Sequence, residues 1–232
     1  MEWKGWRDAD FGQFTPEQAV YFAHELKASG ISTVRGLTVV ELGFGNGSFA
    51  GWVRGAGGRW IGRESTPELQ GRAAQAGYEV IAPEVSFSGP CGAGRVDLIV
   101  AFDVVEHLEL DAIEYFLAEA KEALRPGGLL VYRVPSGDSP FSTAIYHGDL
   151  THRTLLGSGA ARQLAIKAGL EVCHVRSPVL PVFGIGPWHA ARRIVALSAR
   201  TLAFSFVRNV LMGHAGAVVS PNMIVVLRKE VG

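Results

Sequence analysis

Short apolar runs alternate along this chain with stretches that have helical spacing. The apolar runs predict seven strands, at about 37–42, 59–64, 79–82, 97–102, 128–134, Glu171–Ser177 and Met223–Lys229. Apolar positions three and four residues apart predict helices at about 15–28, 48–56, 67–76, 111–124 and 159–168. Strands that alternate with helices indicate an α/β protein with a doubly wound, mostly parallel sheet. We therefore expect a ligand at the carboxyl ends of the strands.

The run TVVELGFGNGSFA, at Thr38–Ala50, predicts a buried strand, a glycine-rich turn and the start of a helix. The strand ends in an acid, Glu41, and glycines follow at positions 43, 45 and 47. Glycines let the backbone turn tightly and approach a ligand, and the next helix offers free N–H groups. A dinucleotide-binding turn reads G-x-G-x-x-G and cradles a pyrophosphate. The carboxylate of Glu41 would repel a pyrophosphate, so the turn better suits a cationic or amine-bearing ligand.

Two further strands of the pattern also end in an acid. The strand at Arg59–Arg63 is followed by Glu64, about 20 residues past the glycines, where a ribose diol is bound in nucleotide-binding sheets. Ser65 or Thr66 can cap the helix that follows. The strand DLIVAFD ends at Asp103. All these acids fall on the predicted ligand-binding edge.

Four segments between about Thr38 and Pro135 resemble the class I S-adenosylmethionine-dependent methyltransferases. ELGFGNG is similar to motif I, and Glu64 matches the acid that binds the ribose. DLIVAFDVVEHL looks like motif IV, nearest to the branch with the ubiquinone-biosynthesis O-methyltransferases, and LRPGGLLVYRVP resembles the usual entry into the fifth strand. The resemblance implies S-adenosylmethionine as cofactor and a Rossmann-like seven-stranded sheet with an antiparallel last strand and helices on both faces. The cofactor-binding residues it implies are Glu41, Gly43, Phe44, Gly45, Asn46, Gly47, Glu64, Ser65, Asp103 and Val104.

The polar segment 146–154 is the candidate acceptor site. It follows the fifth strand, and its GDLTHRT run resembles bacterial methyltransferases found with polysaccharide and sugar biosynthesis. We expect O-methylation of a hydroxyl on a sugar, a polysaccharide precursor or another small molecule. A sugar hydroxyl has a high pKa and gains from a general base. His152 is the first candidate base and His107 the second, with Asp149 or Asp103 to orient either; no metal is expected.

The chain is expected to form a single methyltransferase domain over 1–232, with an N-terminal helical cap at 1–30 and a helical insertion at 184–215. Thr15, Pro16 and Gln18 predict a capping box at the first helix. The very apolar segment 187–212 has three interpretations: a cover over the acceptor pocket, a homodimer face, or an interfacial helix that contacts a membrane. The aromatic side chains of the N-terminus either close the pocket as a lid or pack beside the sheet; they are Trp3, Trp6, Phe11 and Phe14.

Composition narrows the class of protein. The 232 residues are 48% hydrophobic with a formal net charge of +0, which gives no support for binding nucleic acid. Cys91 and Cys173 lie far apart, so we expect neither a disulfide framework nor a metal site from them, and a cytoplasmic location. The N-terminus lacks an apolar signal region, and no stretch is expected to reach the apolar length of a membrane span.

Two other functions stay open at this point. Arg63 could pair with Glu64 and weaken ribose binding, and an arginine beside a ribose acid also occurs in 2′-phosphate recognition, which would suit an NADP-dependent oxidoreductase. The chain could also be an S-adenosylmethionine-binding module without catalysis. The third strand ends without a clear adenine-binding acid, Glu84 being a candidate, and 86–94 is predicted to be a loop.

Overall fold

The computed structural model describes residues 11–184, 186–213 and 216–231 of the chain. In this part, seven strands form one sheet in the order β3-β2-β1-β4-β5-β7-β6. Their bounds are β1 Thr38–Leu42, β2 Arg59–Arg63, β3 Glu79–Ile81, β4 Val96–Phe102, β5 Leu124–Pro135, β6 Glu171–Arg176 and β7 Asn222–Arg228. Strand β7 is antiparallel to both of its neighbours, β5 and β6. The predicted seven-stranded sheet with an antiparallel last strand is confirmed.

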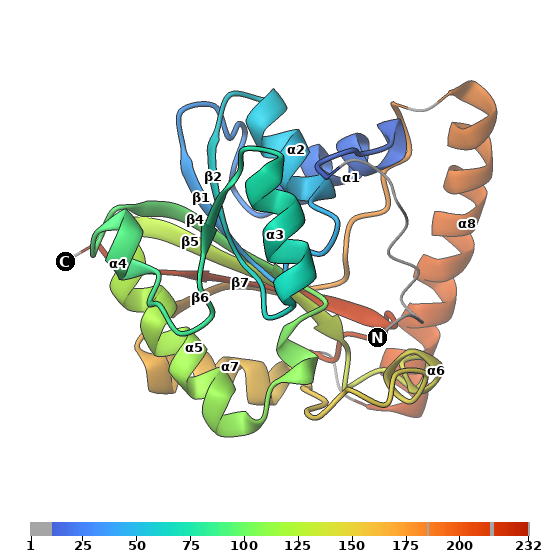
Figure 1. The fold of residues 1–232 in the computed structure, drawn as a ribbon. Helices are drawn as coiled ribbons and strands as arrows, with labels where there is room; N and C mark the ends of the chain where they lie inside the picture. Colours follow the sequence, from blue (N-terminus) through green and yellow to red (C-terminus); the bar gives the residue numbers. More distant parts are fainter. Residues whose placement is uncertain (1–10, 185, 214–215, 232) are drawn as a thin grey trace.

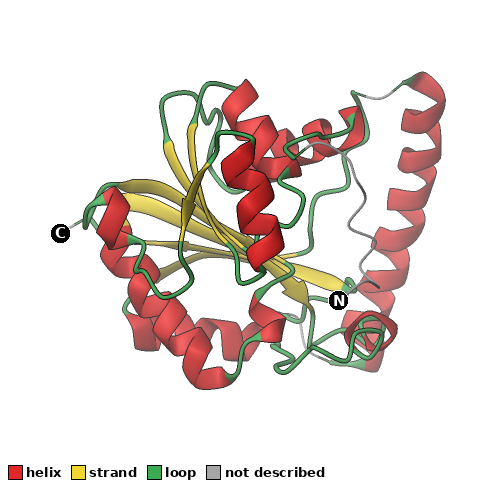
Figure 2. Cartoon of the chain, viewed as in Figure 1, coloured by secondary structure: helices red, strands yellow, loops and turns green. Residues whose placement is uncertain are grey.

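Helices cover both faces of this sheet (Figure 1, Figure 2). One face carries α1 Pro16–Ala28, α2 Ser48–Gly55 and α3 Pro67–Gln75, and the other carries α4 Ser88–Cys91, α5 Leu110–Ala123 and α7 Ser158–Ala168. Beyond the strands' carboxyl ends lie the short helices η2 Val105–His107 and α6 Thr143–Tyr146, and the long helix α8 Pro187–Phe206 that continues into η3 Val207–Leu211.

The central strands are apolar at successive positions because both of their faces are buried. Successive side chains of a strand point to opposite faces. Val39 packs in the cluster under α1, α2 and α3, whereas Val40 packs in the cluster under α5 and α7, and both are fully buried. Such continuous apolar runs are typical of a parallel sheet covered on both sides.

Arg63 does not pair with Glu64. Its guanidinium forms an ion pair with Glu119 of α5, with Nη1 2.7 Å from Oε1, and lies over the ring of Phe87 at 3.8 Å from the centroid. Arg63 is therefore not positioned beside Glu64, as the interpretation with a bound 2′-phosphate and an NADP-dependent oxidoreductase requires. The segment 86–94 was also predicted wrongly in part, because it contains the short helix α4 and the fully buried Phe87.

The capping box of α1 is confirmed, and we expect it to stabilise the folded chain. Thr15 accepts a hydrogen bond from the N–H of Gln18, and the Gln18 side chain accepts one from the N–H of Thr15. We expect Thr15→Ala to lower the free energy of unfolding by about 1 kcal/mol, because the side-chain cap is lost. Thr66 occupies the same position at α3 without a side-chain cap bond, so Thr66→Ala is the matched control. Equal losses in urea unfolding would contradict the prediction.

Helix α8 corrects the expectation about membrane-spanning length. Among the described residues, the segment Pro187–Leu211 is long and apolar enough, by length and composition, to cross a membrane. The reason is that Arg200 is the single charged residue between Arg193 and Arg208. The predicted helix at 187–212 is confirmed as a helix, and its three interpretations remain predictions.

Candidate functional site

The glycine-rich turn after β1 has the backbone that its sequence predicts. Gly43, Gly45 and Gly47 have φ angles of 69°, 53° and 73°, in the left-handed region that favours glycine. A Cβ atom at Gly43 would lie 2.4 Å from Cγ2 of Val104, and one at Gly47 would lie 2.3 Å from Cζ of Phe11. The turn is therefore packed against two other segments, and Val104 supports it from the loop after β4.

Glu41 is a buried carboxyl group beside this turn. Its Oε2 accepts a hydrogen bond of 2.7 Å from Nε1 of Trp60. Burial raises the pKa of Glu41 to about 8; the bond from Trp60 lowers it and the nearby charge of Glu64 raises it. A buried carboxyl with this pKa gains from a cation placed beside it, since the cation stabilises the charged form.

Glu64 lies at the end of β2 and joins the turn to the start of α3. Its carboxylate accepts hydrogen bonds from the N–H of Gly45 at 3.2 Å, of Ser65 at 2.8 Å and of Thr66 at 3.1 Å. The predicted ribose acid and the predicted glycine turn are thus in direct contact. The predicted Ser65 adds a weak bond from its hydroxyl to the same carboxylate, at 3.3 Å.

Asp103 has a different partner from the one expected. It has a φ of 58°, unusual for a residue other than glycine, and pairs with both Nε and Nη2 of Arg133. Arg133 also donates to the hydroxyl of Tyr21 on α1, at 3.0 Å. Asp103 therefore does not orient either histidine. Sequence reasoning missed Arg133 and Tyr21, although an arginine inside the apolar strand LLVYRV was a signal for the first.

His152 lies in the segment after β5 with a defined ring orientation. Its Nδ1 lies 2.7 Å from the carbonyl oxygen of Tyr146. A carbonyl only accepts, so this bond assigns the proton to Nδ1 and leaves the lone pair on Nε2. The rings of His152 and His107 are 4.7 Å apart between centroids, so the structure brings the two predicted bases together.

His107 is held through Thr151 and Asp149. The Thr151 hydroxyl donates to Oδ1 of Asp149 at 2.6 Å, so it accepts from Nδ1 of His107 at 2.9 Å. This assigns the His107 lone pair to Nε2 as well. Asp149 is a predicted orienting residue that acts on His107 through Thr151, and the role of Thr151 was not foreseen.

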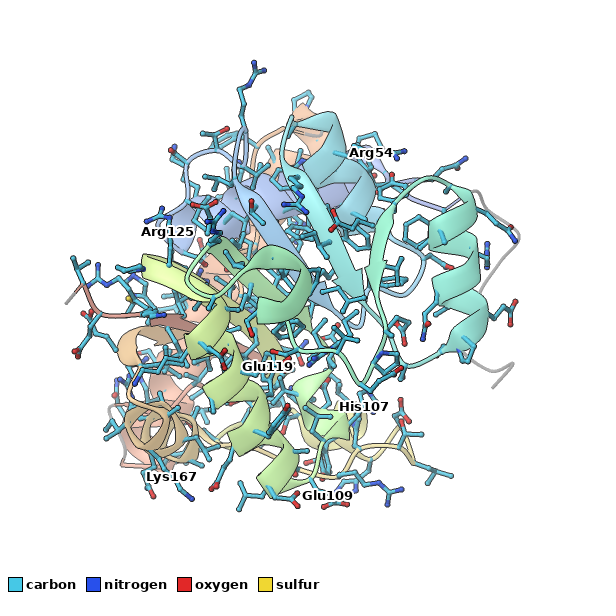
Figure 3. All side chains as sticks on the ribbon, turned by 60° about the vertical axis from the view of Figure 1, so that its left-hand side comes forward. Arg54, His107, Glu109, Glu119, Arg125 and Lys167 are labelled. Atoms are coloured by element: carbon cyan, nitrogen blue, oxygen red, sulfur yellow. The ribbon has the colours of Figure 1, made fainter. Side chains whose placement is uncertain are left out.

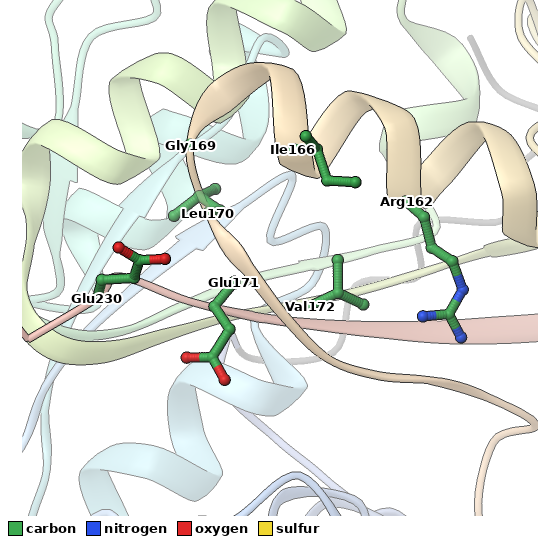
Figure 4. Close-up of a pocket in the computed structure, with 7 residues that line it drawn as sticks. All are labelled: Arg162, Ile166, Gly169, Leu170, Glu171, Val172 and Glu230. Atoms are coloured by element: carbon green, nitrogen blue, oxygen red, sulfur yellow. The ribbon is translucent and has the colours of Figure 1, made fainter.

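These side chains line a cavity of about 360 Å³ at the carboxyl edge of the sheet. Figure 3 shows His107 at the opposite end of the sheet from Arg125. The cavity's lining residues are Asp103, Glu106, His107, Pro135, Ile145, Gly148, Asp149, His152 and Asn222. A second cavity, of about 380 Å³, lies where β6 begins and is lined by Glu171, Glu230 and Arg162 among others (Figure 4). It is distant from the glycine turn along the strands, so the first cavity is the candidate acceptor site.

Three side chains of the acceptor cavity have the chemistry of metal ligands. Glu106, His107 and His152 offer ligand atoms that all lie within 4.8 Å of one another. Imidazole nitrogens and a carboxylate are common ligands of divalent transition metals. The same three groups can equally serve proton transfer. Treatment with a chelator distinguishes a metal site from a site of proton transfer.

The sequence profile of the methyltransferase domain family matches residues 4–175. This chain belongs to that methyltransferase family. A ubiquinone biosynthesis O-methyltransferase from Methylobacterium sp. (strain 4-46) is 30% identical to this methyltransferase over 128 residues. The match covers 50% of this chain and 51% of that protein, so the chain spans about half the length of the curated relative it matches.

Solved structures of methyltransferases share the fold. A SAM dependent methyltransferase from Archaeoglobus fulgidus has a TM-score of 0.64 at 13% identity, covering 93% of this chain and 95% of that one. An S-adenosylmethionine dependent methyltransferase from Mesorhizobium loti has a TM-score of 0.59 at 16% identity, covering 92% and 100%. The 1,6-didemethyltoxoflavin-N1-methyltransferase of Burkholderia thailandensis, solved with S-adenosylhomocysteine, has a TM-score of 0.53 at 17% identity, covering 93% and 78%.

Two of these structural neighbours are named as dependent on S-adenosylmethionine. The residues at the glycine turn fit it. Oδ1 of Asn46 is buried, and no hydrogen-bond donor reaches it among the described residues. The carboxyl groups of Glu41 and Glu64 match a ligand with a positively charged amino group and a ribose diol.

Proposed function

We propose that this methyltransferase transfers a methyl group from S-adenosylmethionine to a hydroxyl of a sugar, a polysaccharide precursor or another small molecule. The observation that carries the proposal is the histidine pair at the acceptor cavity, in which hydrogen bonds at Nδ1 orient both rings. A high-pKa hydroxyl needs such a base, whereas an amine acceptor needs it less. The curated relative is an O-methyltransferase, which supports the same choice.

The proposed roles divide between the two parts of the site. The glycine turn with Glu41, Asn46 and Glu64 binds the cofactor, which supplies a methyl group already activated by the sulfonium charge. His152 accepts the hydroxyl proton on Nε2 as the new C–O bond forms and the bond between the methyl carbon and sulfur breaks, which leaves a neutral thioether. The carbonyl of Tyr146 stabilises the charged ring through Nδ1–H. The walls of the cavity position the acceptor and exclude water, which is the larger part of catalysis for an activated donor.

Methyl transfer from labelled S-adenosylmethionine to a panel of monosaccharides, sugar phosphates and catechols tests the proposal. We expect S-adenosylhomocysteine as a product together with a methyl ether. Calorimetry with S-adenosylmethionine and NADPH runs in parallel, and only the first is expected to bind. Cofactor binding without methylation of any hydroxyl would favour the catalytically silent module instead.

Removing metal ions gives an independent prediction about the cavity. We expect turnover to be unchanged, within about twofold, after dialysis against EDTA, because His152 transfers the proton without a metal. Replenishment with Mg²⁺ or Zn²⁺ is the control. A loss of turnover that either ion restores would instead assign the cluster of Glu106, His107 and His152 to a metal site.

The remaining predictions from the sequence concern the N-terminal lid, the cysteines, the location of the protein and its partners. Phe11 packs on Gly47 and edge-on against Phe44, at 5.5 Å between ring centroids, and Phe14 is largely exposed. Trp3 and Trp6 lie outside the described residues, so the lid stays a prediction. Both cysteines are free thiols. A cytoplasmic location, a homodimer and a membrane contact through 187–212 stay predictions as well.

A further inference from the structure

Helix α8 turns a single narrow face toward the rest of the chain. Between residues 190 and 204, the buried or half-buried positions are Ala190, Arg193, Leu197, Arg200 and Phe204, and every other position is exposed. Spacings of three and four place these five side chains on one face. Phe204 stacks on Phe141, just before α6, with 5.8 Å between ring centroids. This inner face therefore carries two arginines.

The apolar side chains of α8 are not confined to its inner face, as they would be in an ordinary surface helix. Its outer face exposes large apolar side chains, with Trp188 77%, Val195 70% and Leu202 75% exposed. Its inner face holds the guanidinium groups of Arg193 and Arg200 beside Ala190, Leu197 and Phe204, whereas Arg192 is exposed. An ordinary amphipathic helix would place both inner arginines in solvent.

The two inner arginines have no carboxylate partner among the described residues. Arg193 donates from Nε to Nε2 of His189 at 3.2 Å, and Arg200 lies over the ring of Phe204 at 4.9 Å. No ion pair of the described residues includes either guanidinium, and residues 187–211 contain no Asp or Glu. Half-buried guanidinium groups retain several N–H donors in a planar fork that matches phosphate oxygens.

The C-terminal end of the inner face of α8 lies near the acceptor cavity. Phe141, which stacks on Phe204, is four residues before Ile145, and Ile145 lines the cavity with His107 and His152. Figure 1 shows the C-terminal part of α8 next to α6, beyond the carboxyl ends of the strands. An acceptor whose hydroxyl reaches His152 can therefore extend past α6 toward Arg200.

We propose that Arg193 and Arg200 bind a phosphate group of the methyl acceptor. The inference rests on the proposed function and narrows it to phosphorylated acceptors, such as a sugar phosphate or a sugar joined to a lipid through a diphosphate. The two arginines are seven residues apart on one face, about 10 Å along the helix axis. Their guanidinium groups contact His189 and Phe204, and both flexible side chains can turn from these contacts toward a mono- or diphosphate placed between them.

The test uses inorganic pyrophosphate as the probe and calorimetry as the measurement. We expect saturable binding to the unmodified chain, and at least a tenfold rise in Kd in the double variant Arg193→Gln/Arg200→Gln. The matched control is Arg192→Gln/Arg162→Gln, which removes two exposed arginines, one of them on the outer side of α8. The control is expected to bind within about twofold of the unmodified chain.

A second arm identifies the source of the phosphate. Sedimentation with phosphatidylglycerol vesicles, but not with phosphatidylcholine vesicles, that is lost in the Arg193/Arg200 variant would assign the phosphate to a lipid acceptor. Pyrophosphate binding without vesicle binding would assign it to a soluble acceptor. Absence of both, or equal weakening in the control variant, overturns the inference.

The affinity for S-adenosylmethionine is measured in every variant and is expected to stay unchanged. This readout shows that the variants are folded. It also separates this inference from the proposed function, because a failure of pyrophosphate binding leaves cofactor binding and methyl transfer intact. Conversely, pyrophosphate binding by a chain that methylates no hydroxyl would leave the arginine site standing and remove the proposed reaction.

Discussion

Replacing His152 with asparagine is expected to lower turnover by about 10²- to 10⁴-fold, the usual contribution of a general base. Asparagine can keep an N–H bond to the carbonyl of Tyr146 but offers no basic nitrogen to the acceptor. Steady-state methyl transfer measures the loss. The Kd for S-adenosylmethionine is expected to stay within about twofold.

His147 provides the matched control, because it lies five residues earlier in the same segment and is exposed. His147→Asn is expected to leave turnover and cofactor affinity unchanged. If His152→Asn weakened cofactor binding as much as turnover, the residue would be structural. Undiminished turnover in His152→Asn together with a loss in His107→Asn would transfer the base role to His107.

Replacing Glu41 with glutamine is expected to raise the Kd for S-adenosylmethionine by about 30-fold or more. Removing one partner of a buried charge pair costs at least about 2 kcal/mol. Glutamine retains an oxygen that accepts the bond from Trp60, so the change removes the charge and little else. Calorimetry measures the affinity, and Glu230→Gln, at an exposed position beside the second cavity, is the control. An unchanged affinity would separate Glu41 from the cofactor's cationic end.

The pKa of Glu41 makes the same interaction dependent on pH. Burial raises this pKa to about 8, so the free protein holds the carboxyl mostly protonated at neutral pH. A bound cation favours the carboxylate, so binding releases a proton, and the affinity is expected to rise with pH up to about 8. Calorimetry in two buffers with different ionisation enthalpies detects the proton. Glu41→Gln is expected to show no such release.

The stability of the folded chain changes with pH in the opposite direction to the affinity for S-adenosylmethionine. The folded chain keeps this proton between the ordinary carboxyl pKa of 4.5 and the raised value of about 8, while the unfolded chain loses it. The contribution of Glu41 to the free energy of unfolding is therefore complete below pH 4.5 and is lost as pH rises toward 8. Urea unfolding of Glu41→Gln is expected to show a gain relative to the unmodified chain that grows over this window.

The sheet and the cofactor turn were predictable because their signals are local. Apolar runs mark the strands, and the alternate glycines from Gly43 to Gly47 mark a turn in which all three glycines have positive φ angles. Glu64 follows from its distance to that turn along the chain. Predicting such features requires only neighbouring residues and the rule that parallel strands end at a common edge.

Long-range pairing was not predictable in the same way. Arg63 and Glu64 are adjacent in sequence, yet the strand points them to opposite faces, and Glu119, the partner of Arg63, lies 56 residues away. Asp103 likewise has Arg133 as its partner instead of a histidine. The inward arginines of α8 also needed the structure, because periodicity identifies a face but not its direction.

The position of β7 has a consequence for how the chain reaches this fold. Strand β6 pairs only with β7 among the described strands, and α8 lies between the two in sequence. During synthesis, both edges of β6 therefore stay unpaired until β7, more than forty residues later in the chain, has left the ribosome. Pairing of such separated strands is slow, since the intervening loop must close first. The exposed backbone of β6 in that interval is where chaperone binding or aggregation of the nascent chain should be sought.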